Sequence, residues 1–372
     1  MATLTLYYGT NRAHTGSDRW NPTGYGARFS SDGAENLRFG RIGMSADSKK
    51  LTSYLTKRQK VLGEGDGEGL GDWLAQQPMS IAAYRESIDP TVADAHQPNA
   101  VFGSAALFAA LKGHMDKGAD VLIYIHGFNV AWNEAVGAAL ALQEQLNHHG
   151  DQPVVVVLFS WPSDGKSMPF TSYRSDRTDA KASGYAVGRA LLKFRDFLML
   201  LRSQVANGEA KPCNQEIHLL CHSMGNYVLQ NALARIAEFS PGTLPRMLTN
   251  VFLCAADVDD DVLEPGEPLG RLDELTQAIN VYTNRGDNAL RISDFTKGNP
   301  DRLGSAGPAR PQQVHTKVLQ VDCTPIIGGL VEHSYYLTGK VNRDIAQTIA
   351  GLEAEMIKRA RKRVHDRCVS LT

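Results

Sequence analysis

The chain has 372 residues, of which 42% are apolar and 21% are charged. This length can bury a large core, and it fits one large α/β domain with extensions or two domains. Because 39 lysines and arginines stand against 40 aspartates and glutamates, no strong field favours nucleic acid or anionic lipid, and a small neutral substrate fits best.

Targeting signals are not apparent in the sequence. No apolar run approaches the ~18 residues needed to cross a bilayer, so we expect no membrane span. The first residues, MATLTLYYGTNRAH, have no basic leader followed by an apolar stretch and a cleavage site, so no secretory signal is expected. The five cysteines are scattered and odd in number, as is typical of buried free thiols. These features predict a cytoplasmic protein.

The first hundred residues combine short extended runs, notably TLTLYYGT, with polar sequence rich in turn residues. They do not follow a regular pattern of helices or strands. No linker rich in proline or serine separates them from the rest of the chain. We therefore predict an N-terminal extension over residues 1–100, packed on the core as a lid or cap, and a main domain over residues 101–372.

From ALFAALKGHM onwards, strands and helices alternate. ADVLIYIHGF and QPVVVVLFSW are continuous apolar runs, as expected for strands buried on both faces. NEAVGAALALQEQLNHHG and ASGYAVGRALLKFRDFLMLLRSQVANG have helical spacing, and each ends at a glycine. This alternation predicts an α/β fold with a mostly parallel central sheet and helices on both faces. The further predicted elements are the strands EIHLLC, NVFLCAAD, AINVYTN and TKVLQVD, and a closing helix over RDIAQTIAGLEAEMIKRARKRV.

A strand-to-helix turn at residues 221–225 carries a candidate nucleophile. The strand EIHLLC runs into His222, Ser223 and Met224, and GNYVLQNALARIAEF begins a helix at once. Such a turn lifts the serine clear of the backbone and aims the amino end of the helix at the same point. The sequence Cys-His-Ser-Met-Gly departs from Gly-x-Ser-x-Gly only at Cys221, which is small enough to be tolerated. We predict that Ser223 is the nucleophile of an acyl-transfer reaction.

A second turn can supply hydrogen-bond donors for a negatively charged oxygen. The strand LIYI runs into His126, Gly127 and Phe128, so the Phe128 amide can point at the pocket that the Met224 amide faces. We predict that these two backbone N–H groups form the oxyanion hole. His126 directly precedes the turn, and this position suits bracing the turn better than acting as a base.

Three histidines follow Ser223 in the chain. His365 lies in the basic closing helix, and His315 opens a strand, which places it at the wrong end of that strand. His333 follows a late strand at its carboxyl end, where ligands collect in open α/β sheets. We therefore predict His333 as the general base.

Two aspartates compete for the role of the acid that orients the base. Asp287, in NVYTNRGDNALR, comes just after the strand that precedes His333, and the order serine, acid, histidine is expected of hydrolases with such a sheet. Asp257, in CAADVDDDVL, also follows a buried strand, but the aspartates at 259–261 would disturb a neighbouring base. We prefer Asp287 and keep Asp257 as the alternative.

Several ordered motifs together resemble a known family. They are YYGTNR, YIHGFN, FSWPSDG, YRSDRTDAKAS, HLLCHSMGN, CAADVD and NRGDNALRIS, and they resemble a mainly bacterial family of α/β-hydrolase-fold proteins known as a domain of unknown function. The resemblance implies the α/β-hydrolase fold and a serine esterase or lipase-like activity, with Ser223, Asp287 and His333 in the triad positions. It names no substrate, because the fold hosts many chemistries.

The segment SWPSDGKSMPFTSYRSDRTDAKAS follows a strand at the same edge of the sheet. Long segments at that edge often carry specificity, so Trp161 and Tyr173 either line the substrate pocket or pin the segment down. Both interpretations stay open. The residues that we assign to the substrate pocket are His126, Gly127, Trp161, Tyr173 and His222.

The sequence therefore predicts a serine hydrolase whose catalytic domain, residues 101–372, cleaves carboxylic esters of short to medium chain length through an acyl-enzyme. We expect a small-molecule ester as partner, and no metal or organic cofactor. One alternative is acyl transfer, or amide or thioester hydrolysis, by the same three residues. Another is an inactive binding protein on the same scaffold. The natural substrate and the oligomeric state leave no signal in the sequence.

Overall fold

The computed structural model describes residues 1–87, 100–163, 169–240, 242–290, 301–327, 333–353, 356 and 359–372. Within these residues, eleven strands form one twisted sheet. In spatial order its strands are β14 (Arg361–His365), β15 (Cys368–Leu371), β13 (Val318–Asp322), β12 (Thr276–Thr283), β11 (Leu248–Cys254), β10 (Ile217–His222), β8 (Asp120–Ile125), β9 (Val154–Ser160), β1 (Ala2–Thr10), β4 (Arg38–Ala46) and β7 (Met79–Ala83).

The middle of the sheet is parallel. Every neighbouring pair from β1 through β9, β8, β10, β11, β12 and β13 to β15 is parallel, whereas β4, β7 and β14 join antiparallel at the two ends. The chain passes from β8 to β9 on one side and then returns to place β10 on the other side of β8. The strand order thus reverses beside β8, and in α/β sheets the crevice at such a switch point is where ligands bind.

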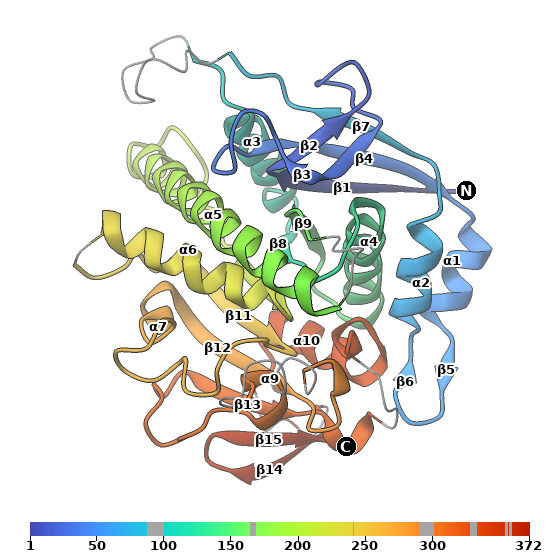
Figure 1. The fold of residues 1–372 in the computed structure, drawn as a ribbon, viewed down its shortest axis with the longest axis vertical. Helices are drawn as coiled ribbons and strands as arrows, with labels where there is room; N and C mark the ends of the chain where they lie inside the picture. Colours follow the sequence, from blue (N-terminus) through green and yellow to red (C-terminus); the bar gives the residue numbers. More distant parts are fainter. Residues whose placement is uncertain are drawn as a thin grey trace.

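Helices cover both faces of the sheet, because the strands are apolar on both sides. One apolar cluster joins α3, α5 and α6 to one face, and a second joins α2, α4 and α10 to the other. Figure 1 shows α5 and α6 lying side by side, with α4 across the sheet from them. The helices are α1 (Ser48–Leu55), α2 (Gly67–Leu74), α3 (Gly103–Met115), α4 (Trp132–His149), α5 (Pro169–Ala206), α6 (Gly225–Phe239), α7 (Leu272–Leu275), α9 (Leu303–Ala306) and α10 (Gly339–Ile349).

The N-terminal extension contributes directly to the main sheet. β1 pairs with β9, and β4 and β7 extend the sheet beyond it; Figure 1 shows these blue strands at one end and the red β14 and β15 at the other. Two small hairpins complete this part, β2 (Arg12–Thr15) with β3 (Gly24–Phe29) and β5 (Arg58–Gln59) with β6 (Gly63–Glu64). The division of the chain at residue 100, and a role of the first part as a lid, stay predictions.

Two helices differ from their predicted bounds. α5 begins already at Pro169, before the predicted helical stretch that starts with ASGYAVGR, and proline is favoured in the first turn of a helix. The closing helix ends at Ile349, and the basic segment after it contains the strand β14. The Asp344 carboxylate explains this second difference, because it accepts from the Nε and Nη2 of Arg361, both at 2.7 Å, and from the Nη2 of Arg359 at 3.1 Å. These tertiary contacts hold the arginines in an extended segment.

The predicted fold class is confirmed: the mostly parallel sheet with helices on both faces is the α/β-hydrolase arrangement, and extra N-terminal strands extend it. Among the described helices, none combines the length and apolar character that crossing a bilayer requires.

Candidate active site

The carboxyl ends of β8 and β10 bring the two predicted turns together. Cys221 pairs with Ile125 in the sheet, so residues 126–128 and 222–224 leave neighbouring strands at the same edge. The two turns are in close contact, since a Cβ atom placed on Gly127 would lie 2.8 Å from the Ser223 Cβ and 3.2 Å from the His222 Nδ1. Glycine at 127 is therefore required for this approach of the two backbones.

Ser223 lies on the predicted strand-to-helix turn. Its φ angle is +51°, in the left-handed region that residues other than glycine rarely adopt. The turn is held on both sides, since the Ser223 amide donates to the Cys254 carbonyl at 3.0 Å and the Asp257 amide donates to the Ser223 carbonyl at 3.2 Å. A Cβ atom on Gly225 would lie 2.5 Å from the Ile125 carbonyl oxygen, so only glycine fits there. Cys221 fills its fully buried position without a comparable conflict.

Backbone strain is concentrated at this edge of the sheet. Among the described residues, three besides glycines have a positive φ angle: Asn129 at 54°, Ser223 at 51° and Ala255 at 46°. Each follows the carboxyl end of a central strand, β8, β10 or β11. Strain of this kind costs of order 1–3 kcal/mol per residue and clusters at functional sites.

The two predicted oxyanion donors have no acceptor among the described residues. In the part of the chain that the structure describes, neither the Phe128 nor the Met224 amide donates a hydrogen bond. Met224 caps the amino end of α6, where the helix dipole adds a partial positive charge. Both amides are thus available to an anionic oxygen, and their assignment as the oxyanion hole stays a prediction.

The predicted acid and base are in direct contact. The Nδ1 of His333 lies 2.7 Å from the Oδ2 of Asp287. The Asp287 side chain is buried, and its Oδ1 accepts from the amides of Ala289 at 3.0 Å and Leu290 at 3.2 Å. These bonds fix the carboxylate, which in turn fixes the imidazole ring.

His333 is also tied to the turn that carries Ser223. The Nε2 of His222 donates to the His333 carbonyl oxygen at 3.2 Å, and the two rings are 4.7 Å apart. Burial, and the charge of His333 beside it, hold the pKa of His222 well below its usual value. His222 therefore acts as a neutral donor that joins the histidine segment to the nucleophile turn. Its predicted contact with substrate stays a prediction.

Two tyrosines that the sequence analysis missed anchor the same segment. The Tyr335 hydroxyl accepts from the Ala255 amide at 3.0 Å and donates to the Tyr282 carbonyl at 2.9 Å. The Tyr336 hydroxyl bonds that of Tyr124 at 2.5 Å, and its ring packs 4.7 Å from that of His222. The tyrosine pair two and three residues after His333, in HSYYL, was the available signal.

The alternative acid, Asp257, has different partners. Its Oδ2 accepts from the Tyr173 hydroxyl at 2.7 Å, and its Oδ1 lies 3.4 Å from the Nε of Arg302. Arg302 is buried and also pairs with Asp259. Of the two aspartates, Asp287 is the one hydrogen-bonded to His333.

Comparison with known families identifies the family of the chain. A family described as an alpha/beta hydrolase of unknown function (DUF900) matches residues 104–342, more than half of the chain. The chain belongs to this family. The resemblance predicted from the ordered motifs is thereby confirmed.

One curated relative of this DUF900 chain is an uncharacterized protein of Nostoc sp., alr1448. The two are 23% identical over an alignment of 226 positions, and the match covers 48% of this chain and 54% of the relative. The chain thus aligns with about half the length of that relative.

A buried relay supports the oxyanion turn of the DUF900 domain from the N-terminal strands. Arg12 donates through its Nε to the Ser160 hydroxyl at 2.9 Å, and that hydroxyl lies 3.1 Å from the Nε2 of His126. The Nδ1 of His126 donates to the Gly127 carbonyl at 2.9 Å. Burial, together with the charge of Arg12, lowers the pKa of His126 to about 3, so the ring is neutral. The relay agrees with a bracing role for His126.

Trp161 and Tyr173 flank this turn. The Trp161 ring is fully buried, stacks on His126 at 5.5 Å and donates to the His126 carbonyl at 3.0 Å. Tyr173 is partly buried and packs 5.7 Å from the Phe128 ring while it bonds Asp257. In this structure both side chains support the turn, and a substrate contact for them stays a prediction.

Proposed function

We propose that this protein is a serine hydrolase that cleaves carboxylic esters through a triad of Ser223, His333 and Asp287. The observation that carries the proposal is the bond of 2.7 Å between the His333 Nδ1 and the Asp287 Oδ2. This bond joins two residues 46 positions apart. The backbone of His333 is also hydrogen-bonded to His222, the residue before Ser223. The α/β-hydrolase family supports a hydrolase scaffold.

In the proposed first half-reaction, the Ser223 Oγ attacks the ester carbonyl carbon and its proton passes to the Nε2 of His333. Asp287 holds the Nδ1 proton and stabilises the imidazolium that forms. The amides of Phe128 and Met224 donate to the carbonyl oxygen as it becomes an oxyanion. When the intermediate collapses, the bond to the leaving alcohol breaks, and the alcohol takes the proton from His333.

In the second half-reaction, water attacks the acyl-serine. His333 accepts a proton from the water as the new C–O bond forms, and it returns this proton to the Ser223 Oγ when the acid leaves. The proposed mechanism needs no group beyond these side chains and the two amides. We infer a short- to medium-chain ester as substrate.

The test is hydrolysis of p-nitrophenyl esters of increasing acyl length by the wild type, Ser223→Ala and His333→Ala. We expect the wild type to turn over short esters, and each variant to lose about three orders of magnitude or more in kcat. Ser53→Ala and His14→Ala replace exposed residues of the same types and should keep wild-type rates. Wild-type turnover in Ser223→Ala would refute the proposal.

Labelling with a fluorophosphonate, located by mass spectrometry, separates the alternatives. Labelling of Ser223 without ester cleavage would show an activated serine with another substrate class, such as an amide or thioester. A wild type that forms ester product in place of acid when an alcohol competes with water would be an acyltransferase. No labelling and no turnover would indicate an inactive binding protein on the hydrolase scaffold.

A further inference from the structure

A large open cavity lies at the amino ends of the central strands, opposite the candidate active site at their carboxyl ends. It has a volume of about 810 Å³ and is lined by residues at the start of three central strands: Val121, the second residue of β8, and Ile217 and Leu248, the first residues of β10 and β11. The candidate active site follows the last residues of β8 and β10, so the length of a strand, roughly 15–20 Å, separates the two places. The cavity is therefore distinct from the triad.

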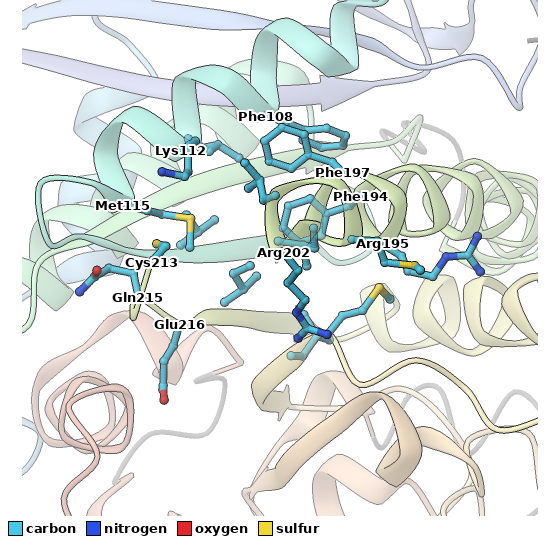
Figure 2. Close-up of a pocket in the computed structure, with 18 of the residues that line it drawn as sticks. Phe108, Lys112, Met115, Phe194, Arg195, Phe197, Arg202, Cys213, Gln215 and Glu216 are labelled. Atoms are coloured by element: carbon cyan, nitrogen blue, oxygen red, sulfur yellow. The ribbon is translucent and has the colours of Figure 1, made fainter. Parts of the chain in front are cut away.

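The wall of the cavity is apolar and aromatic. Helices α3 and α5 contribute Phe108, Leu111, Met115, Phe194, Phe197 and Leu198. Figure 2 shows the three phenylalanines gathered together above the centre of the cavity. Met199, which also lines the cavity, is 60% exposed. The volume of this apolar cavity is in the range that is typical of small-molecule sites.

A second, smaller cavity shares part of this apolar wall. Its volume is about 70 Å³, and its lining includes Phe108, Leu111, Val121 and Phe194, which also line the large cavity. The remaining lining residues, such as Ile123, Val157 and Leu191, are apolar apart from Gly9. This smaller cavity between the sheet, α3 and α5 suits a hydrocarbon chain.

Positive charges surround the large cavity. Lys112, Arg195, Arg202, Lys211 and Arg246 line it, and Glu216 is the one carboxylate among its described lining residues. This excess is local, because the whole chain has 39 basic and 40 acidic residues. In Figure 2, Lys112 lies to one side of the phenylalanines and Arg202 below them, while the Glu216 carboxylate points away.

Three of these cations are available to a ligand. Lys112 pairs with Asp116, and Arg195 pairs with Asp196 at 2.7 Å. Arg202, Lys211 and Arg246 are exposed, and within the described ranges none of their side chains forms an ion pair or a hydrogen bond. Exposed cations beside an aromatic wall complement a ligand that is apolar along its length and anionic at one end.

We propose that this cavity binds a single-chain amphiphile with an anionic head, a free long-chain carboxylate, with its chain along the phenylalanines and its head between Arg202, Lys211 and Arg246. The charges favour an anion, and the depth of the apolar lining favours a chain over a polar anion such as phosphate. The inference does not depend on the esterase proposal, because the cavity shares no residue with the triad.

The free thiol of Cys213 reports on this cavity. Cys213 lines it and is partly exposed, whereas Cys221, Cys254, Cys323 and Cys368 are buried. The experiment measures the rate at which a maleimide labels Cys213 in the folded protein, with laurate added below its micelle concentration. We expect laurate to slow labelling at least about fivefold by covering the thiol, and Cys213→Ser to abolish labelling.

Matched ligands and variants define the site. Affinity measured by calorimetry should rise roughly three- to fourfold per added methylene from octanoate to laurate, and dodecylamine, with the opposite charge, should give no protection. In Arg202→Gln/Arg246→Gln, laurate affinity should fall about tenfold, and the loss should shrink at high salt. Arg28→Gln/Arg41→Gln removes two exposed arginines from β3 and β4 and should leave affinity unchanged.

Several outcomes would overturn the inference. Laurate that binds without protecting Cys213, or binds equally to the Arg202→Gln/Arg246→Gln variant, occupies another place. Protection by anionic phosphatidylglycerol vesicles but not by laurate would make this face a membrane-binding surface instead. Equal protection by dodecylamine would show an apolar cavity without selection for an anion. Because the two arginines are exposed, their replacement leaves the folded core intact.

Discussion

The two ends of the parallel central strands, called here the carboxyl edge and the amino edge of the sheet, are built in opposite ways. At the carboxyl edge, buried and partly buried polar side chains are bonded to one another, as in Asp287 with His333 and Ser160 with His126. At the amino edge, Arg202, Lys211 and Arg246 are exposed on long flexible side chains beside an apolar cavity. The described non-glycine residues with positive φ all lie at or just beyond the carboxyl edge.

This difference matches two kinds of task. A reaction needs groups held within about half an ångström of their working positions, which buried bonds and backbone strain provide. Binding an amphiphile needs apolar area and charge of the right sign, and flexible cations serve this purpose without fixed geometry. Substitutions should therefore have large effects on turnover at the first edge and small effects at the second.

The largest expected effect concerns the acid. Asp287→Asn keeps the acceptor for the Ala289 and Leu290 amides but no longer holds the Nδ1 proton of His333. We expect kcat for a short p-nitrophenyl ester to fall by roughly three to four orders of magnitude. Asp257→Asn should cost less than about tenfold, because its partners are Tyr173 and Arg302. The reverse ranking would make Asp257 the acid.

The next effect concerns the contact of the two turns. In Gly127→Ala, the new methyl group would lie 2.8 Å from the Ser223 Cβ, and the turns must separate. A displacement near 1 Å can cost about 100-fold in rate, so we expect kcat to fall by this factor. Gly113→Ala is the control, since nothing lies within 4 Å of the added methyl on α3. It should keep full activity and raise stability by about 0.5–1 kcal/mol.

The relay behind the oxyanion turn should appear in acid stability. Since the folded protein keeps His126 neutral down to about pH 3, against 6.5 for the free side chain, the unfolded state binds more protons between these values. The free energy of unfolding should therefore fall with decreasing pH in this window, by up to about 1.4 kcal/mol per pH unit. In urea unfolding, the free energy of unfolding of His126→Asn should fall less steeply with decreasing pH than that of the wild type. The control His14→Asn, which replaces an exposed histidine, should show the wild-type decline.

The smallest effect is expected at the amino edge. Without added carboxylate, Arg202→Gln/Arg246→Gln should change kcat/KM for a short ester by less than about twofold. Its Tm should change by less than about 2 °C, because exposed charges contribute little to stability. A large loss of turnover in this variant would show that the two edges are coupled and would end the contrast between them.

The sequence predicted the strands and turns of the carboxyl edge because local signals mark them. Apolar runs such as VLIYI and IHLLC are typical of strands buried on both faces, and the small residues around Ser223 identify a tight turn. The chain order of Ser223, Asp287 and His333 then restricted the choice of acid and base. In contrast, the pairing of β1 with β9 joins residues about 150 positions apart, and local sequence carries no signal for such a partner.

The sequence by itself determined the α/β class with a mostly parallel sheet, because alternating apolar runs and helical periodicity have few compact arrangements; the α/β-hydrolase family followed from the resemblance of its ordered motifs. Only the tertiary structure decided the partners of buried polar groups. The basic segment after Ile349 has helical composition, yet Arg359 and Arg361 bind Asp344 and a strand forms. Arg12 likewise gains its role from Ser160, 148 positions away. A buried charge must find its counterpart wherever the fold places it, and neither spacing nor composition records that place.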